Sequence, residues 1–439
     1  MLRMFPFRAN SSDQRGASAH HGVFTTSAIV RLTLGWLALL LAPLIPHQPS
    51  TPTAFFLLAA LIGVITLCSL GVVAQAEALA HRLGDPYGTL VLTLSIVIIE
   101  VILISAVLLG PGNHQEIARD SIMTVSMIIM NLVAGVGLII LSARGSRSAR
   151  QDRSARHAGV EKRERNSSSS KRGPRTTTGS TANHVHAPSQ PGANEQAPLA
   201  PNPVGVRAYL ARIAILGALA FLLPVLIGSD GAYTPVQSTI VAGVVATFYG
   251  WFLHRQLGQR STDFQELGSH PAQRADLRQR EPLHGIWKQH RGEIVIRALV
   301  LIATAIPIVI LAHNMASLLE LTAQRFTLPS ALPAAIIATI VFLPETITTF
   351  RAANRGEPQR VSNLCHGALL SSFGLTIPSV LTISVLTGKA VTLAESPANL
   401  ALFFATVLLT GASFRGRPRA SAGAAHLLLF GLYAVVTFS

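Results

Sequence analysis

Long apolar blocks, each of about 20 residues, dominate this sequence and constrain its fold more than any other feature. Hydrophobic residues make up 49% of the 439 positions, and charged residues only 13%. A helix needs about 20 apolar residues to cross the hydrocarbon core of a bilayer, and these blocks reach that length. The sequence therefore predicts an all-α, polytopic membrane protein.

About eleven blocks are long enough to be transmembrane helices, and Pro or Gly marks several of their ends. The first block ends in "LIPHQPS" without a small-residue cleavage site, which favours a retained helix over a cleaved signal peptide. We expect one extra N-terminal helix followed by two five-helix halves. The predicted spans are 27–46, 54–82, 86–110, 117–142, 206–228, 234–254, 292–313, 328–353, 359–388, 393–414 and 422–438.

The positions of Lys and Arg predict which helix ends face the cytoplasm. These residues outnumber Asp and Glu by 35 to 20, but they lie in loops, where the positive-inside rule explains them without nucleic acid. All the basic loops fall on one side if the N-terminus is cytoplasmic and the C-terminus is outside. The two five-helix halves then have opposite orientations, which is the pattern of inverted-repeat transporters.

Composition also divides the chain into segments. Residues 143–203 are rich in Ser, Arg, Pro, Asn and Gly and nearly free of bulky apolar side chains, so we expect a disordered basic linker on the cytoplasmic side. The predicted segments are a cytoplasmic N-terminal tail (1–26), a first transmembrane group (27–142), the linker (143–203), the rest of the first half (204–254), a cytoplasmic loop between the halves (255–291) and the second half (292–439).

Two glutamates lie inside apolar blocks, Glu100 in "SIVIIEVILIS" and Glu345 in "IVFLPETITTF". An ionised carboxylate near the bilayer centre costs roughly 2.5–3.5 kcal/mol on insertion scales, so such residues indicate a function. Each lies on the second helix of its half, about 20 Å from opposite faces at 1.5 Å per residue. A structural carboxylate paired with another helix is the alternative for Glu100 alone, and the mirrored position of Glu345 disfavours it.

A buried carboxylate pair is suited to exchanging a cation for protons. Burial and a neighbouring carboxylate favour the protonated form, whereas a bound cation favours the ionised form. Calcium takes roughly six to eight oxygen ligands, so hydroxyl, amide or carbonyl groups must complete the site. Pro344 cannot donate to the carbonyl of Ile340 and frees that oxygen. The further candidate ligands are Ser126, Asn131, Ser371, Ser372 and Thr376, with hydroxyls that bond back to their own helix as the alternative.

Other polar residues in or near the apolar blocks have simpler interpretations. Gln75, Glu77 and His81 cluster at the predicted cytoplasmic end of the second span. They suggest either an entry funnel for ions or, as the preferred interpretation, exposure at the membrane surface. His366 and His426 lie in apolar helices, where hydrogen-bonded packing is preferred to proton relay.

No motif of an ATP-driven pump or a common hydrolase occurs in the sequence. Walker A, HExxH and GxSxG patterns are all absent. This absence favours a secondary transporter over an enzyme, with no cofactor beyond the transported ions.

Three ordered segments carry a resemblance to a known family: "AEALAHRLGDPYGTLVLTLSIVIIEV", "LPETITTFRAANRGEPQRVSNLCHGALLSSFGLTIPSV" and "GAAHLLLFGLYAV". Together they resemble the bacterial ChaA-type calcium/proton antiporters of the cation/calcium exchanger superfamily. The resemblance implies about eleven helices and two inverted alpha repeats, here 86–142 and 328–388. It also implies a cation site with one acidic residue per repeat, which map to Glu100 and Glu345. The Gly-Asn pair that often precedes those acids in the superfamily is missing here.

We therefore expect a cation/proton antiporter that exports Ca²⁺ in exchange for H⁺ by alternating access. A Na⁺ or K⁺/H⁺ antiporter using the same carboxylates is the first alternative, and a cation channel the second. The expected location is the inner membrane of a bacterium, with a cytoplasmic N-terminus. The expected partners are membrane lipid, small cations and protons, without nucleic acid.

Overall fold

The computed structural model describes residues 25–46, 49–83, 115–147, 154, 200–257, 283–326 and 331–438, together with part of 94–109. The described residues are helical apart from short connections and two isolated β-bridges, Ser229–Ala232 and Ala232–Thr392. The all-α prediction is therefore confirmed for this part of the chain. The predicted tail (1–26) and linker (143–203) lie almost wholly outside the described residues.

The described helices follow the apolar blocks closely, and the part of 94–109 that is described is also helical. Residues 134–147 continue the π-helix η2 as an α-helix. In chain order the elements are α1 (Thr26–Leu41), η1 (Ala42–Leu44), α2 (Thr51–Leu83), α4 (Ile117–Met127), η2 (Ile128–Val133), α6 (Pro203–Gly217), η3 (Ala218–Leu222), α7 (Leu223–Ile227), α8 (Pro235–Leu257), α10 (Leu283–Arg325), α11 (Ala331–Val341), α12 (Leu343–Arg355), α13 (Pro358–Thr387), α14 (Pro397–Ser413) and α15 (Ala420–Phe438).

Eight helical stretches among the described residues are long and apolar enough to cross a membrane. The predicted span 393–414 corresponds to the shorter apolar helix α14, and 86–110 is described only in part. The total of about eleven spans therefore stays a prediction. The eight stretches are Thr26–Leu44, Thr51–Leu79, Ile117–Arg147, Pro203–Ile227, Pro235–Gln256, His290–Leu319, Pro358–Thr387 and Ala420–Phe438.

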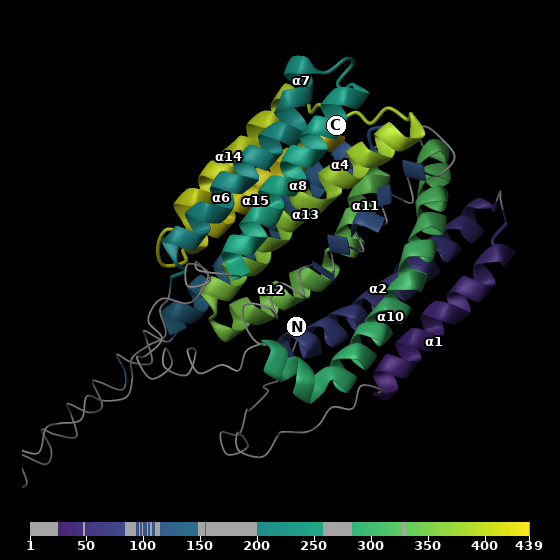
Figure 1. The fold of residues 1–439 in the computed structure, drawn as a ribbon, viewed down its shortest axis with the longest axis horizontal. Coiled ribbons are helices and arrows are strands. Elements are labelled where there is room, and N and C mark those ends of the chain that lie inside the picture. Colours follow the sequence, from purple (N-terminus) through teal and green to yellow (C-terminus); the bar gives the residue numbers. More distant parts are fainter. Residues whose placement is uncertain are drawn as a thin grey trace, which may run out of the picture.

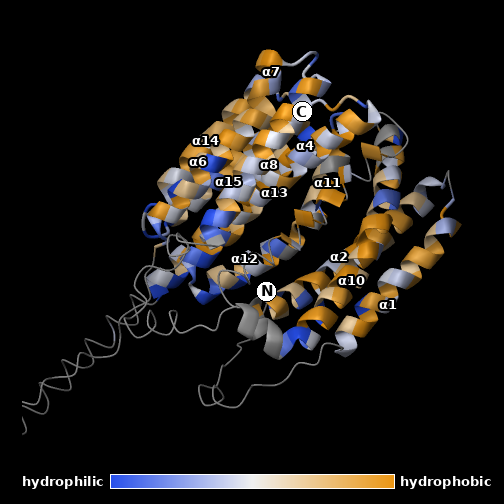
Figure 2. Cartoon of the chain, in the orientation of Figure 1, coloured by the Kyte–Doolittle hydropathy of each residue, from blue (hydrophilic) through white to orange (hydrophobic). Residues whose placement is uncertain are grey.

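The described helices form two groups (Figure 1). Helices α1, α2 and α10 pack against one another on one side of the molecule, and α4, α6, α8, α13, α14 and α15 form a bundle on the other. Helices α11 and α12 lie between the two groups and contact both. Hydrophobic residues run along most of the length of the long helices, and hydrophilic residues are more frequent near helix ends and on the short helix α12 (Figure 2). This distribution is the one expected for helices in a bilayer.

The predicted span 328–353 is interrupted in the structure. Helix α11 ends at Val341, Phe342 has a non-helical conformation, and α12 begins at Leu343. The physical cause is Pro344, which has no N–H group for the helical ladder and fits the first turn of a new helix. Because the break comes directly before it, Glu345 lies in the first turn of α12.

The loop between the halves is shorter than predicted at its C-terminal end. Helix α10 begins at Leu283, inside the expected loop 255–291, and continues to Arg325. It kinks at His290, whose backbone is non-helical (φ −120°, ψ 15°), so the kink lies close to the predicted start of the span. Residues 258–282 lie outside the described part of the chain.

Candidate cation site

The fold brings Glu100 and Glu345 to one place, although they lie in different halves of the chain. Both side chains are buried, with residue exposures of 2% and 6%. Their carboxyl groups are near enough for the charge of Glu100 to act on Glu345. Glu100 belongs to the described helical residues of 94–109, and the broken helix α11–α12 positions Glu345.

The hydrogen bonds of this carboxylate pair (Glu100 and Glu345) are largely unmade. Ser372 on α13 donates its hydroxyl to Oε1 of Glu100 at 2.7 Å. Among the described residues, no other residue hydrogen-bonds to Oε2 of Glu100 or to either carboxylate oxygen of Glu345, although the backbone N–H of Glu345 lies near its own carboxylate. Buried polar atoms almost always have a partner, and exceptions require an explanation such as an ion. Three oxygens of the pair are therefore free to bind a cation or a proton.

Helix α13 contributes further oxygens, and its two adjacent serines differ. Ser371 accepts a hydrogen bond from the Tyr249 hydroxyl at 2.9 Å, whereas Ser372 donates to Glu100. The Tyr249 ring packs directly on Gly374, where any Cβ would overlap the ring. Thr376 lies one helical turn after Ser372, and its buried Oγ1 has no partner among the described residues. Ser372 is thus the candidate hydroxyl ligand that contacts the pair, and Thr376 lies one turn further along α13.

The two candidate ligands from the fourth predicted span make other contacts. Ser126 donates its hydroxyl back to the carbonyl of Ile122 at 2.7 Å. Asn131, within the π-helix η2, donates to Thr406 at 2.9 Å, and its Oδ1 lies 3.0 Å from Nδ1 of His426. These contacts fit hydrogen-bonded packing of His426, and neither residue hydrogen-bonds to the carboxylate pair.

Sequence reasoning missed the residues that surround Glu345 on α12 and α13. Thr349, one turn after Glu345, hydrogen-bonds to the thiol of Cys365, and the charge of Glu345 acts on that thiol. Both residues are nearly fully buried, with exposures of 1% and 2%. The i, i+4 spacing of Glu345 and Thr349 was the available signal, because it places both side chains on one helix face.

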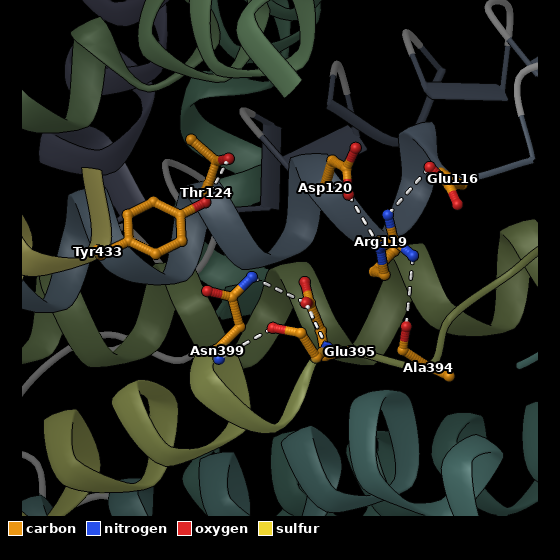
Figure 3. Close-up of polar contacts among 9 residues, drawn as sticks. Glu116, Arg119, Asp120, Thr124, Ala394, Glu395, Asn399 and Tyr433 are labelled. Carbon is orange, nitrogen blue, oxygen red and sulfur yellow. Dashed lines mark hydrogen bonds and ion pairs between the residues drawn. The ribbon is translucent and has the colours of Figure 1, made fainter. Parts of the chain in front are cut away.

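A second group of charged residues, of which Glu395 is buried, lies near the helix ends predicted to face outside. Figure 3 shows its polar contacts. We call it the outer cluster: Glu116, Arg119, Asp120, Glu395 and Asn399. Arg119 bonds to Asp120 at 2.9 Å, pairs with Glu116 at 3.2 Å and donates to the carbonyl of Ala394 at 3.4 Å. Oε2 of Glu395 accepts from the Asn399 side chain at 2.9 Å and from the Ser396 backbone at 3.1 Å.

The outer cluster joins the two halves of the chain. Glu116, Arg119 and Asp120 come from the start of α4, and Glu395 comes from the loop before α14. In the same loop, the backbone N–H of Thr392 donates to the carbonyl of Gln115 at 2.9 Å. Burial raises the pKa of Glu395, although Asn399 and Arg119 oppose that effect. Every carboxylate of the outer cluster has an arginine, amide or backbone partner, in contrast to the carboxylate pair of Glu100 and Glu345.

Comparison with known proteins identifies the family. The family described as "Sodium/calcium exchanger protein" matches residues 53–159 and 296–439. The chain is 27% identical over 383 residues to "Sodium-potassium/proton antiporter ChaA" of Escherichia coli (strain K12), covering 87% of this chain and 88% of that protein. It is also 27% identical over 382 residues to "Putative ionic transporter y4hA" of Sinorhizobium fredii (strain NBRC 101917 / NGR234), covering 85% and 86%.

Solved structures agree with this assignment at the level of the fold. The structure of native YfkE matches with a TM-score of 0.59 at 13% identity, covering 94% of this chain and 98% of that chain. The H⁺/Ca²⁺ exchanger CAX matches with a TM-score of 0.56 at 13% identity, covering 94% and 88%. The helices described above therefore follow an exchanger fold.

Proposed function

Because the chain belongs to the sodium/calcium exchanger protein family, we propose that it exchanges Ca²⁺ for H⁺ at Glu100 and Glu345. Members of an exchanger family are secondary transporters that move ions and are not enzymes. Beyond the family assignment, we propose which cation is transported and which two residues bind it.

The observation that carries the proposal is the pair of buried carboxylates with three oxygens that lack partners among the described residues. Two buried negative charges at short range are costly unless a cation or protons neutralise them. One divalent cation cancels the charge of both carboxylates, and protonation of both gives the same net charge. The site is therefore electrically equivalent in its Ca²⁺-bound and doubly protonated forms, which supports exchange of one Ca²⁺ for two H⁺.

The residues around the carboxylate pair are compatible with both its Ca²⁺-bound and its doubly protonated form. Ser372 holds one oxygen of Glu100 and leaves the other free, so it orients the carboxylate without consuming its binding capacity. Glu345 lies in the first turn of α12, where the helix dipole stabilises its ionised form. The break at Phe342 interrupts the backbone ladder beside the pair, and carbonyl groups at such breaks coordinate cations in other transporters.

Exchange of Na⁺ or K⁺ for H⁺ is the second candidate. The observation that favours it is the 27% identity, over most of the chain, to a protein named as a sodium-potassium/proton antiporter. The same two carboxylates bind a monovalent cation and a proton together, or two monovalent cations. The choice depends on the number of oxygen ligands around the ion, because Ca²⁺ requires roughly six to eight.

Transport in everted membrane vesicles tests the proposal. Vesicles that contain the protein carry a preformed pH gradient, and Ca²⁺, Na⁺ or K⁺ is added separately. We expect Ca²⁺ to dissipate the gradient, and vesicles with the Glu100→Gln/Glu345→Gln double variant at equal abundance to show no such effect. Dissipation by Na⁺ or K⁺ alone would select the second candidate. Cation flux that persists without proton counter-flow would indicate a channel, and no response to any cation would refute antiport by this chain.

A further inference from the structure

Helix α12 leads from the carboxylate pair to the face that the basic loops predict to be cytoplasmic. Thr348 and Arg351 follow Glu345 at intervals of three residues, so their side chains lie on adjoining parts of one helix surface. At 1.5 Å per residue, Thr348 lies about 4.5 Å and Arg351 about 9 Å further along the axis. These two residues therefore mark a short path from Glu345 towards that face.

Glu77 of α2 meets both residues on this path. Thr348 donates its hydroxyl to Oε1 of Glu77 at 3.4 Å, and Nη1 of Arg351 lies 3.6 Å from Oε2. Helix α2 belongs to the group of α1, α2 and α10, so these contacts join that group to α12, which lies between the two groups. Exposure increases along the path, from 3% for Thr348 to 33% for the Glu77 side chain and 56% for that of Arg351.

We propose that Glu77 is a third cation-binding carboxylate, which captures the incoming cation at the predicted cytoplasmic entrance and passes it to Glu345. The proposal rests on the proposed function and deepens it. A long, partly exposed ion pair contributes little stability, so a cation can displace Arg351 from Glu77 readily. The cation is then held by Glu77 and the Thr348 hydroxyl, less than two helical turns from Glu345.

A purely structural ion pair between α2 and α12 is the competing explanation, and two variants distinguish the explanations. Glu77→Gln removes the carboxylate, whereas Arg351→Gln removes its competitor and leaves the carboxylate in place. If the pair only clamps the helices, both variants break the clamp and have similar effects. If Glu77 binds the cation, the variants differ in the direction of their effect.

The experiment measures KM and kcat for Ca²⁺ in vesicles of both orientations, so that the cation reaches either face separately. For Glu77→Gln, we expect KM to rise about fivefold for Ca²⁺ supplied at the face with Arg351, with kcat and the opposite face unchanged. For Arg351→Gln, we expect KM at that face to stay the same or fall. Glu357→Gln is the matched control, because Glu357 also pairs with an arginine, at 3.4 Å, and its side chain is 35% exposed.

Two results would overturn the role of Glu77 while the native chain still exchanges Ca²⁺. One is an unchanged KM in Glu77→Gln at normal abundance, and the other is an equal rise in KM in Glu77→Gln and Arg351→Gln. Absence of exchange by the native chain would instead count against the proposed function. If Na⁺ or K⁺ proves to be the transported ion, the same measurements with that ion apply.

Discussion

The protein contains two groups of acidic residues that differ in their burial and in their partners. In the carboxylate pair, Ser372 donates a hydrogen bond to one oxygen of Glu100. The other three carboxylate oxygens of Glu100 and Glu345 accept none from any other described residue. In the outer cluster, by contrast, Arg119 pairs with Glu116 and Asp120, and Glu395 is bonded by Asn399 and Ser396.

This difference separates two uses of a buried carboxylate. A carboxylate with short, fixed partners holds structural elements together, because those partners already compensate its charge. A buried carboxylate without partners is stabilised only when a proton or a cation binds to it. Burial alone therefore does not distinguish the two uses, and the unmade hydrogen bonds of Glu100 and Glu345 are what supports the proposed cation site.

The largest expected effect comes from neutralising the carboxylate pair. Glu100→Gln or Glu345→Gln should reduce cation/proton exchange at least about a hundredfold, because losing one partner of a buried charge interaction costs about 3 kcal/mol. The protein should remain folded, since removing one of two neighbouring negative charges relieves repulsion. Vesicle transport and thermal unfolding in detergent measure the two quantities, with Glu116→Gln, at the 58% exposed outer position, as the control. A variant that kept full exchange would remove its residue from the site.

A substitution in the outer cluster should lower stability and leave transport nearly unchanged, which is the opposite of the effect expected for the carboxylate pair. Arg119→Gln removes the ion pair with Asp120 and the nearby positive charge that acts on Glu395. Because these side chains are partly exposed, we expect the free energy of unfolding to fall by about 2 kcal/mol. The KM for cation transport by the protein that remains folded should change little. Thermal unfolding together with transport normalised to abundance checks both statements. A large change in KM with unchanged stability would show that the outer cluster takes part in transport.

The adjacent serines of α13 offer a finer test of the same comparison. Ser372→Ala removes a hydrogen bond to a charged group, worth about 1.5 kcal/mol, and should raise the KM for the cation about tenfold. Ser371→Ala is the matched control, because its hydroxyl bonds to Tyr249 instead and its loss should leave KM nearly unchanged. Equal effects of the two substitutions on KM would contradict the separate roles described here.

The smallest expected effect concerns the pH dependence of stability. Burial raises the pKa of Glu395, so its protonated form favours the fold at low pH, and this contribution is lost as pH rises through the raised pKa. Glu395→Gln stays neutral and should therefore raise Tm by about 1 °C at pH 8, on the scale of about 1 kcal/mol for a chain of this length. Near pH 4, where both proteins are neutral at this position, the difference should vanish. A Tm difference that grew as the pH fell would contradict the assigned direction.

Much of the candidate site could be predicted from residue type alone. Glu100 and Glu345 are recognisable because ionisable residues are rare inside long apolar blocks, and the pattern of basic loops predicts that their helices run in opposite directions. The identity of the hydroxyl ligands could not be predicted in the same way. Ser371 and Ser372 are adjacent and chemically identical, and only the neighbouring helices decide which of them meets Glu100.

For the fold as well, some features could be predicted from the sequence and others could not. Apolar blocks predicted the helices well, because the requirement to satisfy backbone hydrogen bonds in lipid leaves few alternatives. The interruption at Phe342 was harder to predict, since Pro378 also lies within a helix and α13 continues through it. The start of α10 at Leu283 was missed because that stretch is polar and carries no signal of membrane burial.

The sequence by itself thus determined a helical membrane protein with two costly carboxylates, because hydropathy and desolvation act on each residue independently of its distant neighbours. Only the tertiary structure decided which groups those carboxylates meet. The contact between Ser372 and Glu100 joins residues 272 positions apart, and that between Thr348 and Glu77 joins residues 271 apart. Helical periodicity predicts the face on which a side chain lies, but the packing of whole helices determines what lies opposite that face.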